Sequence, residues 1–300
     1  MALVCLIGAI AIYKPAFLAG YNIYIVSRQT AYMGLAALGV FFVILTGGID
    51  LSLSSTVSLG GFTAGLAMVA GVHPALALVI GLLTGAVVGA VSGAVVAFIG
   101  VTPFIVTLGM LGITRSTVLL IKHGDSVRGI PASFIKFGNG DVAGFSVPVI
   151  VLIVVAALAH ILTRHTAFGR RVYAIGGNEE ATALSGVNTR RVKFLTYVIC
   201  SSLCAVTGML YISRFNSAQA DAGKGLELDP IAAAVIGGTS LMGGEGSVFG
   251  VLVGAAIMGV IRNGLVFLGV SPYLQDLIIG AIIILAAILD VIRSRRHRRT

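Results

Sequence analysis

Two glycine-rich segments carry acidic and hydroxyl side chains inside otherwise apolar stretches. The first is LTGGIDLSLSSTVSLGG, residues 45–61, which contains Asp50. The second is VIGGTSLMGGEGSVFG, residues 235–250, which contains Glu245. Each segment follows an apolar run, breaks it with a glycine pair and resumes with small hydroxyl residues. Broken helices that recur in two halves of a membrane chain indicate a transport pathway.

The acidic side chains in these segments are suited to capping a helix or binding an ion. The hydroxyl groups are suited to weak hydrogen bonds with a solute. For Asp50 a cap on the next helix is favoured over direct contact with a solute. An ion-coupled carrier needs carboxylates within the membrane, and the candidates Asp50, Glu245 and Asp276 are few and lie near breaks or predicted helix ends. The sequence contains no metal constellation, no nucleophile–base set and no G-x-x-x-x-G-K-[ST] phosphate loop. We therefore expect no catalysis by this chain, and no cofactor or metal bound to it.

The composition is typical of an integral membrane protein. Hydrophobic residues make up 57% of the 300 residues and charged residues only 10%, against about 25% charged in soluble domains. Residues 51–114 contain no Asp, Glu, Lys or Arg, and at about 20 residues per crossing they supply three spans. These runs lack the alternation of barrel strands. We predict an all-α protein with one transmembrane domain over residues 1–300.

About ten transmembrane helices are expected, with broken segments at the glycine pairs. The predicted spans are 1–13, 30–46, 52–71, 75–99, 103–121, 146–163, 194–213, 230–243, 248–268 and 272–292. The span 230–243 is short and glycine-rich, which favours a half helix. The span 1–13 is short for a crossing, so we expect a first helix whose opening turns are missing or mis-started.

Basic residues predict the orientation of the chain. The loop at 164–193 and the tail at 293–300 are both rich in arginine, and positive loops stay on the cytoplasmic side. Four crossings fit between them, and six crossings before the loop place the N-terminus inside as well. The loops at 122–145 and 214–229 then lie outside.

Glycine spacing and isolated charges predict helix packing. Gly81, Gly85, Gly89 and Gly93 recur every four residues, a stripe that lets two helix backbones approach closely in lipid. Three charges, Arg115, Arg262 and Asp276, lie within or at the ends of predicted spans. For the arginines we favour snorkelling or pairing with a carboxylate over a functional site.

The loop sequence YAIGGNEEATALSGVNTRRVK, residues 173–193, predicts a short helix with its own ends. Gly176 and Gly177 break the chain, Asn178 is a good N-cap, and two glutamates occupy the first turn, where the helix dipole favours them. Gly186 is placed as a C-terminal stop. Such a helix is too short to be stable alone, so it packs either on its own membrane domain or on another protein.

Several separated motifs resemble the ribose-type sugar permeases of ABC importers. The resemblance is carried by SRQTAYMGLAALGVFFVILTGGIDLSLSS near the start, by FGRRVYAIGGNEEATALSGVNTRRVKFLTYVICSSLCAVTGML, and by GLELDPIAAAVIGGTSLMGGEGSVFGVLVGAAIMGVIRNGLVFLGVSPYLQDLIIGAIIILAAI. It covers almost the whole chain. Members of this family usually have a longer, charged N-terminal segment and a full first helix.

The resemblance implies a multi-pass permease of the bacterial inner membrane, with three kinds of partner. These are a cytoplasmic ABC ATPase that binds ATP and Mg²⁺, an extracytoplasmic sugar-binding protein, and a second permease subunit, most simply in a homodimer. The loop helix would be the coupling helix that docks on the ATPase. Its residues would be Asn178, Glu179, Glu180, Leu184, Ser185 and Gly186. The translocation pathway candidates are Thr46, Asp50, Ser52, Ser54, Ser55, Thr239, Ser240 and Glu245.

Two alternatives remain beside monosaccharide import. One is a secondary transporter driven by H⁺ or Na⁺, and the other is an ABC permease for branched-chain amino acids or nucleosides. The sequence motifs ELDPIAAAVIGGTSLMGG and GGNEEATALSGV look closer to those of the sugar permeases. The sequence identifies neither the sugar nor the choice between homodimer and heterodimer.

Overall fold

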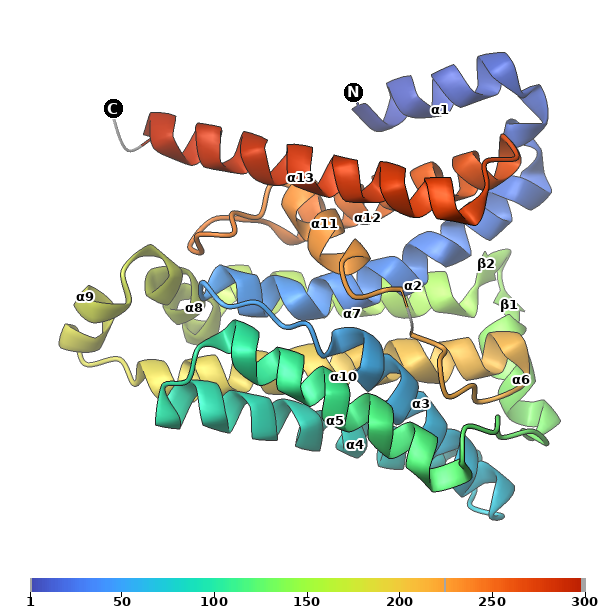
Figure 1. Cartoon of the computed structure of the whole chain (residues 1–300), viewed down its shortest axis with the longest axis horizontal. Coiled ribbons are helices and arrows are strands. Elements are labelled where there is room, and N and C mark those ends of the chain that lie inside the picture. The colour runs from blue at the N-terminus through green and yellow to red at the C-terminus, as the bar shows by residue number, and fades with distance from the viewer. Residues whose placement is uncertain (1, 224, 298–300) are drawn as a thin grey trace.

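The computed structural model describes residues 2–223 and 225–297, and nearly all of its regular structure is helical. Long helices run roughly along one axis of the molecule (Figure 1). The first half contains α1 Ala2–Tyr13, the short 3-10 helix η1 Pro15–Leu18, α2 Gly20–Leu45, α3 Leu53–Val69, α4 Pro74–Ala94, the π-helical turn η2 Val95–Ile99 and α5 Pro103–Lys122. The remainder contains α6 Ala132–Asn139, the strands β1 Asp141–Val142 and β2 Phe145–Ser146, α7 Val147–His165, α8 Ala167–Gly177, α9 Glu179–Leu184, α10 Thr189–Phe215, α11 Asp229–Ile236, α12 Val248–Phe267 and α13 Pro272–His297.

A helix matches each of the ten predicted spans, which confirms the helical membrane architecture. Within the described part of the chain, six helices are long and apolar enough to cross a membrane: α2, α4 with η2, α5, α7, α10 and α12. The helices α1, α3 and α13 also contain apolar segments, but these are shorter. The loop predicted at 122–145 contains α6 and an antiparallel pair of two-residue strands, which the sequence did not reveal.

The start of α2 corrects the predicted span 30–46, because the helix begins at Gly20. Polar residues in this first part lower its hydropathy, and tertiary partners satisfy them. The Asn22 side chain donates to the Phe17 carbonyl at 2.9 Å. The Arg28 guanidinium donates to the Gly138 carbonyl at 3.0 Å and to the Asn139 side chain at 2.6 Å. A hydropathy pattern cannot detect such partners, so the predicted start was ten residues too late.

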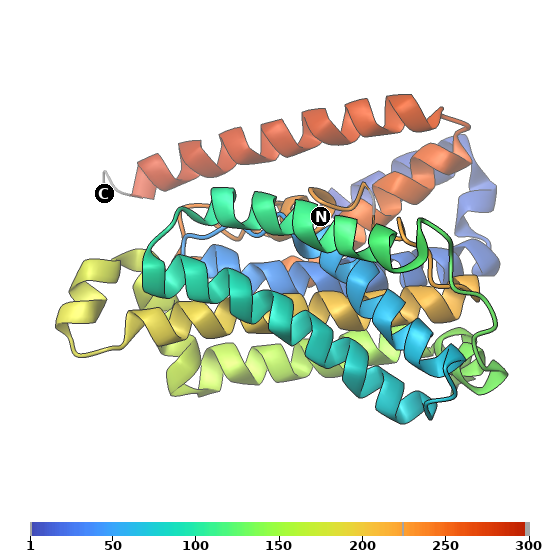
Figure 2. The same cartoon turned by 60° about the horizontal axis from the view of Figure 1, so that its bottom comes forward.

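The centre of the bundle is formed by α2 and α10, which contact each other and most of the surrounding helices. Residues 31–45 of α2 are all buried. Figure 2 shows α4 (teal) lying along α10 (yellow). A Cβ atom built on Gly85 would lie 2.5 Å from the Ser201 carbonyl oxygen, and one on Gly93 would lie 2.9 Å from that of Phe194. The predicted close packing of the glycine stripe is therefore confirmed.

The helices α3 and α11 begin near the middle of the bundle and are shorter than the helices that span it (Figure 1). Helix α3 has 17 residues and α11 has eight. Residues 46–52 lead into α3, and residues 216–228 lead into α11, in both cases without a continuous helix. The prediction of a half helix in 230–243 is confirmed, because α11 ends at Ile236 and Gly237 and Gly238 follow it. Non-helical backbone is tolerated at this depth only where protein or a water-filled cavity surrounds it.

Candidate functional site

The loop between α7 and α10 contains the predicted capped helix. The Asn178 side chain accepts a hydrogen bond from the Ala181 amide at 2.9 Å, so the N-cap prediction is confirmed. The helix α9 is six residues long, and Gly186 has a φ of +83°, which suits a stop at this position. The predicted break at Gly176 and Gly177 is wrong, because both residues are the last turn of α8. Asn178 alone separates the two helices.

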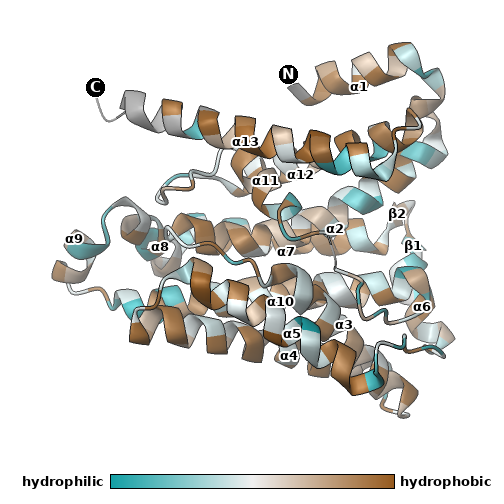
Figure 3. Cartoon of the chain, in the orientation of Figure 1, coloured by the Kyte–Doolittle hydropathy of each residue, from teal (hydrophilic) through white to brown (hydrophobic). Residues whose placement is uncertain are grey.

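The outer face of α9 is open to a partner. Leu184 is 84% exposed, and Glu180 and Ser185 are exposed beside it. The Glu179 carboxylate accepts from the Lys193 ammonium at 2.6 Å, which ties the start of α9 to α10. Figure 3 shows hydrophilic residues gathered around α8, α9 and the start of α10, whereas α4 and α13 are largely hydrophobic.

The first break, residues 46–52, is largely buried and is held by its own side chains and by Thr107 of α5, whose hydroxyl donates to the Ile49 carbonyl at 3.3 Å. One Asp50 carboxylate oxygen accepts from the Ser52 amide at 2.9 Å and from the Ser52 hydroxyl at 2.6 Å. Thr46 donates to the Val43 carbonyl at 2.8 Å. Asp50 is fully buried, and its bonds are those of a turn that precedes a helix. Ser52, not Asp50, is the N-cap residue of α3, so Asp50 holds the turn before this helix and does not cap it as expected. Ser54 and Ser55, at the start of α3, are buried as well.

The second break, residues 237–247, is held by residues from other helices. Thr239 and Ser240 are buried, whereas Glu245 is exposed. The Asp290 carboxylate of α13 accepts from the Leu241 amide at 3.0 Å and from the Ser240 hydroxyl at 3.4 Å. Sequence reasoning missed Asp290, although an acid near the end of an apolar span is a recognisable signal.

The two breaks meet beside the last turn of α8. The Gly244 amide donates to the Leu45 carbonyl at 3.0 Å, which joins the second break to the end of α2. The Tyr173 hydroxyl donates to the Gly246 carbonyl at 2.9 Å. Burial raises the pKa of Tyr173 above its ordinary value, against the opposing charge of Arg164, so the phenol keeps its proton and can donate at neutral pH. Tyr173 was not among the predicted site residues.

A polar cavity of about 390 Å³ lies between α3, α5 and the segment before α11. The C-terminal end of α5, which lines it, lies at the end of the bundle that is remote from α8 and α9 (Figure 1). The lining residues are Ser55, Ser58, Arg115, Leu119, Gly124, Ser126, Ala220 and Asp221. Of the predicted pathway residues, only Ser55 lines this cavity. Its volume is in the range of small-molecule sites, and hydroxyl, guanidinium and carboxylate groups are suitable partners for a sugar.

The isolated arginines are paired, as favoured from the sequence. The Arg115 guanidinium lies 2.5 Å from the Glu227 carboxylate at the side of the polar cavity. Arg262 pairs with Asp229 at the start of α11 and lies 3.9 Å from the exposed carboxylate of Asp276. Asp229 is almost fully buried, so the pair holds the first turn of α11 in place.

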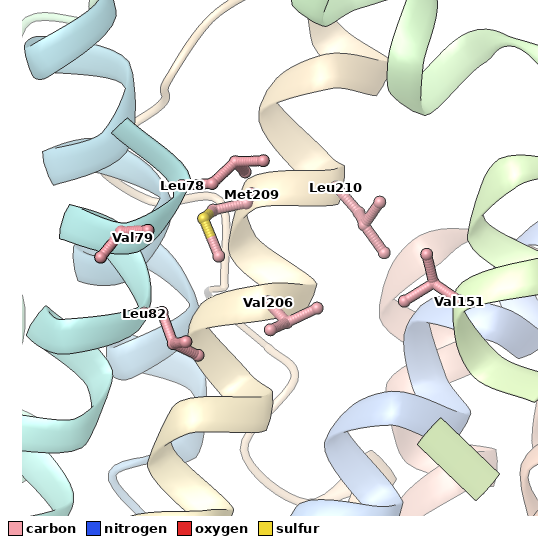
Figure 4. A pocket seen from close by; sticks show the side chains of 7 residues that line it. All are labelled: Leu78, Val79, Leu82, Val151, Val206, Met209 and Leu210. Atoms are coloured by element: carbon pink, nitrogen blue, oxygen red, sulfur yellow. The ribbon is translucent and has the colours of Figure 1, made fainter. Parts of the chain in front are cut away.

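A second pocket, of about 260 Å³, is entirely apolar. Figure 4 shows its side chains projecting from α4, α7 and α10. They are Leu78, Val79, Leu82, Val151, Val206, Met209 and Leu210. A sugar hydroxyl would lose its hydrogen bonds to water there and gain none, at a cost of about 1–3 kcal/mol. This pocket is therefore unsuitable as a binding site for a polar solute.

Comparison with known proteins places the chain among membrane permeases. Residues 22–287 match a family model described as "Branched-chain amino acid transport system / permease component". The ribose import permease protein RbsC of Bacillus subtilis is 41% identical over 292 residues, which cover 97% of this chain and 91% of the relative. No solved structure matches the chain.

Two further relatives have different sugars in their names. The D-allose transport system permease protein AlsC of Escherichia coli is 37% identical over 93% of this chain and 86% of the relative. The fructose import permease protein FrcC of Rhizobium meliloti is 36% identical over 91% of this chain and 79% of the relative. With a family model that covers most of its length and relatives matched nearly end to end, the chain belongs to this family of ABC importer permeases.

Proposed function

We propose that this chain is the membrane-spanning permease subunit of an ATP-driven importer for a monosaccharide. The main support is its similarity, at 36–41% identity over more than nine-tenths of the chain, to permeases named for ribose, D-allose and fructose. The family description names branched-chain amino acids instead, and the polar cavity argues against them. An aliphatic side chain gains little from a cavity lined by Ser55, Arg115 and Asp221.

The energy source in this proposal is a cytoplasmic ATPase that docks on α9. The support is geometric: α9 is capped, projects from the bundle and presents Leu184 with 84% of the side chain exposed (Figure 1). The docking residues are proposed to be Asn178, Glu179, Glu180, Leu184, Ser185 and Gly186. An extracytoplasmic binding protein delivers the sugar to the opposite end.

In the proposed orientation, the loop at 164–193 and both chain termini are cytoplasmic. The C-terminal end of α13 lies toward the same end of the bundle as α8 and α9 (Figure 1), and the positive-inside rule places the arginine-rich loop inside. The side chains of the basic tail, residues 293–300, lie outside the described residues.

The translocation pathway is proposed to run from the polar cavity to the breaks, with a second copy of the permease completing it as a symmetric homodimer. Ser55 and Ser58 on α3 contact the sugar first. Of the other pathway candidates, Thr46, Asp50, Ser52, Ser54, Thr239 and Ser240 are buried. They reach the solute only when the breaks move, which fits alternating access.

Co-purification tests the docking site. The ATPase is expected to accompany the parent chain and to be lost from Leu184→Asp, because a charge replaces the apolar anchor at a site that does not contribute to the core. The matched control is Arg190→Gln, which changes an exposed residue in the first turn of α10, outside α9, and is expected to keep the ATPase. Retention of the ATPase by well-folded Leu184→Asp would contradict docking through this residue.

Uptake tests the substrate class. The parent chain, its ATPase and its binding protein are reconstituted in liposomes and given labelled D-ribose, D-allose, fructose or leucine. ATP-dependent uptake of a sugar but not of leucine is expected. Uptake of leucine alone would support the branched-chain amino acid alternative. Uptake that follows a proton or sodium gradient without ATP would support the ion-coupled one.

A further inference from the structure

Three segments that are far apart in the sequence meet backbone to backbone next to the base of the α8–α9 loop. They are the last turn of α8 at Gly176 and Gly177, the end of α2 at residues 45–47, and the second break at residues 243–246. We call this set of contacts the glycine junction. Within this junction the Gly244 amide donates a hydrogen bond to the Leu45 carbonyl. The Tyr173 hydroxyl donates another to the Gly246 carbonyl.

At Gly176 and Gly243 the contacts of the junction leave no room for a side chain. A Cβ atom on Gly243 would lie 2.9 Å from the Gly47 amide nitrogen and 3.0 Å from the Gly176 Cα atom. A Cβ atom on Gly176 would collide with the Leu45 carbonyl oxygen and the Gly244 amide nitrogen. Gly243 and Gly244 also have φ angles of +85° and +77°, where side chains are disfavoured.

The junction is continuous with the loop that carries α9. Val172 and Ile175 of α8 are buried in the core, so α8 moves with its surroundings as one piece. Asn178 alone separates α8 from α9. A displacement of α9 therefore reaches the last turn of α8 with little flexible backbone in between.

We propose that the glycine junction passes movement of the ATPase-bound loop to both breaks at once, with Gly176 and Tyr173 as the positioning residues. The inference rests on the proposed function, in which α9 binds the ATPase. Backbone that touches backbone has no rotatable side chain to absorb a displacement, and close-packed contacts change between discrete arrangements rather than deforming gradually. One moving element thus shifts the end of α2 and the second break together.

A pair of neighbouring glycines supplies the decisive test. In the reconstituted complex with ATPase and binding protein, Gly176→Ala is expected to lower labelled D-ribose uptake about tenfold while ATP hydrolysis changes less than about twofold. Gly177→Ala is the matched control, because a Cβ atom there meets nothing within 4 Å. Equal uptake by the two variants would overturn the proposal.

The variant Tyr173→Phe decides the question if Gly176→Ala fails to fold. It removes a single hydroxyl and its bond to the second break. Uptake is expected to fall about threefold, as for the loss of one hydrogen bond, with more ATP consumed per ribose. If Tyr173→Phe imports ribose at the parent rate and with the parent ratio of ATP to ribose, the junction does not transmit the movement.

A probe on the second break separates this proposal from the choice of substrate. Met242 is 57% exposed, so Met242→Cys is labelled with an environment-sensitive fluorophore in a Cys5→Ser background, where Cys200 and Cys204 are buried. ATP binding to the complex is expected to change the fluorescence, and Tyr173→Phe to reduce that change. A full response that imports no sugar contradicts the proposed function but supports the junction. A response that Tyr173→Phe leaves unchanged contradicts the junction.

Discussion

In the first break Asp50 accepts two hydrogen bonds from Ser52, only two residues away, whereas in the second break the acid of similar context, Glu245, is exposed. The second break is held instead by Asp290 from α13 and Tyr173 from α8. The two segments share a glycine pair, an acid and hydroxyl residues. The first break has its main bonds within the turn and one from the Thr107 hydroxyl of α5 to the Ile49 carbonyl at 3.3 Å, whereas the second combines a bond from the Ser240 amide to the Glu245 carbonyl with bonds to α8 and α13.

This difference has a mechanical consequence. A turn that is held by its own side chains keeps its shape when the helices around it move. A turn that is held by other helices changes shape when those helices move, because its partners move away from it. We therefore expect the first break to behave as a rigid connection into α3 and the second break to be the more movable one.

The largest expected effect comes from the local turn of the first break. Asp50→Ala is expected to lower the free energy of unfolding by about 3 kcal/mol, because a buried acceptor is lost and the Ser52 amide is left without a partner. Asp50→Asn is expected to lower the free energy of unfolding by less, since its side-chain oxygen still accepts a hydrogen bond. The check is the melting temperature of the purified chain in detergent. Unchanged melting of Asp50→Ala would remove the distinction between the breaks.

The next effect concerns the polar cavity, whose lining includes α3 after the first break but no residue of the second. Asp221→Asn is expected to raise the KM for the transported sugar about tenfold, because a charge-assisted hydrogen bond contributes about 1.5–3 kcal/mol. The matched control is Asp141→Asn, an exposed acid outside the cavity and outside the pathway candidates. Equal KM values for the two variants, measured by uptake in liposomes, would show that the cavity does not contact the sugar.

A smaller effect is expected where the second break depends on α13. Asp290→Ala is expected to lower the free energy of unfolding by about 1 kcal/mol, because the carboxylate is half-buried and water can replace part of its hydrogen bonding. The amide exchange of residues 239–242 is expected to rise while that of residues 48–52 does not. Hydrogen exchange measured by mass spectrometry checks this. Equal exchange in both breaks would mean that Asp290 does not hold the second one.

The smallest effect is expected for the acid of the second break itself. Glu245→Gln is expected to change the free energy of unfolding by less than about 0.5 kcal/mol, as exposed surface substitutions usually do. A melting temperature close to that of the parent chain is the expected result. A loss as large as that of Asp50→Ala would mean that the two acids have the same role.

The sequence predicted the elements that depend on local pattern and missed the partners that come from elsewhere. The half helix at α11, the cap at Asn178 and the glycine stripe of α4 were predicted correctly, because apolar length, cap chemistry and glycine spacing are local signals. The early start of α2 was missed, since the partners of Asn22 and Arg28 lie in other elements. For the same reason Asp290 and Tyr173 were not recognised.

By itself, the sequence determined that this protein is a helical membrane protein with two broken segments and a capped loop helix, while the permease function was implied by its resemblance to a known family. Hydropathy and glycine placement are sufficient for this, because lipid leaves few ways to satisfy a backbone. Only the tertiary structure decided that Ser55 lines a cavity beside Arg115, and that both breaks meet the end of α8. Those contacts join residues distant in the chain, and their geometry depends on how the helices pack rather than on any local pattern.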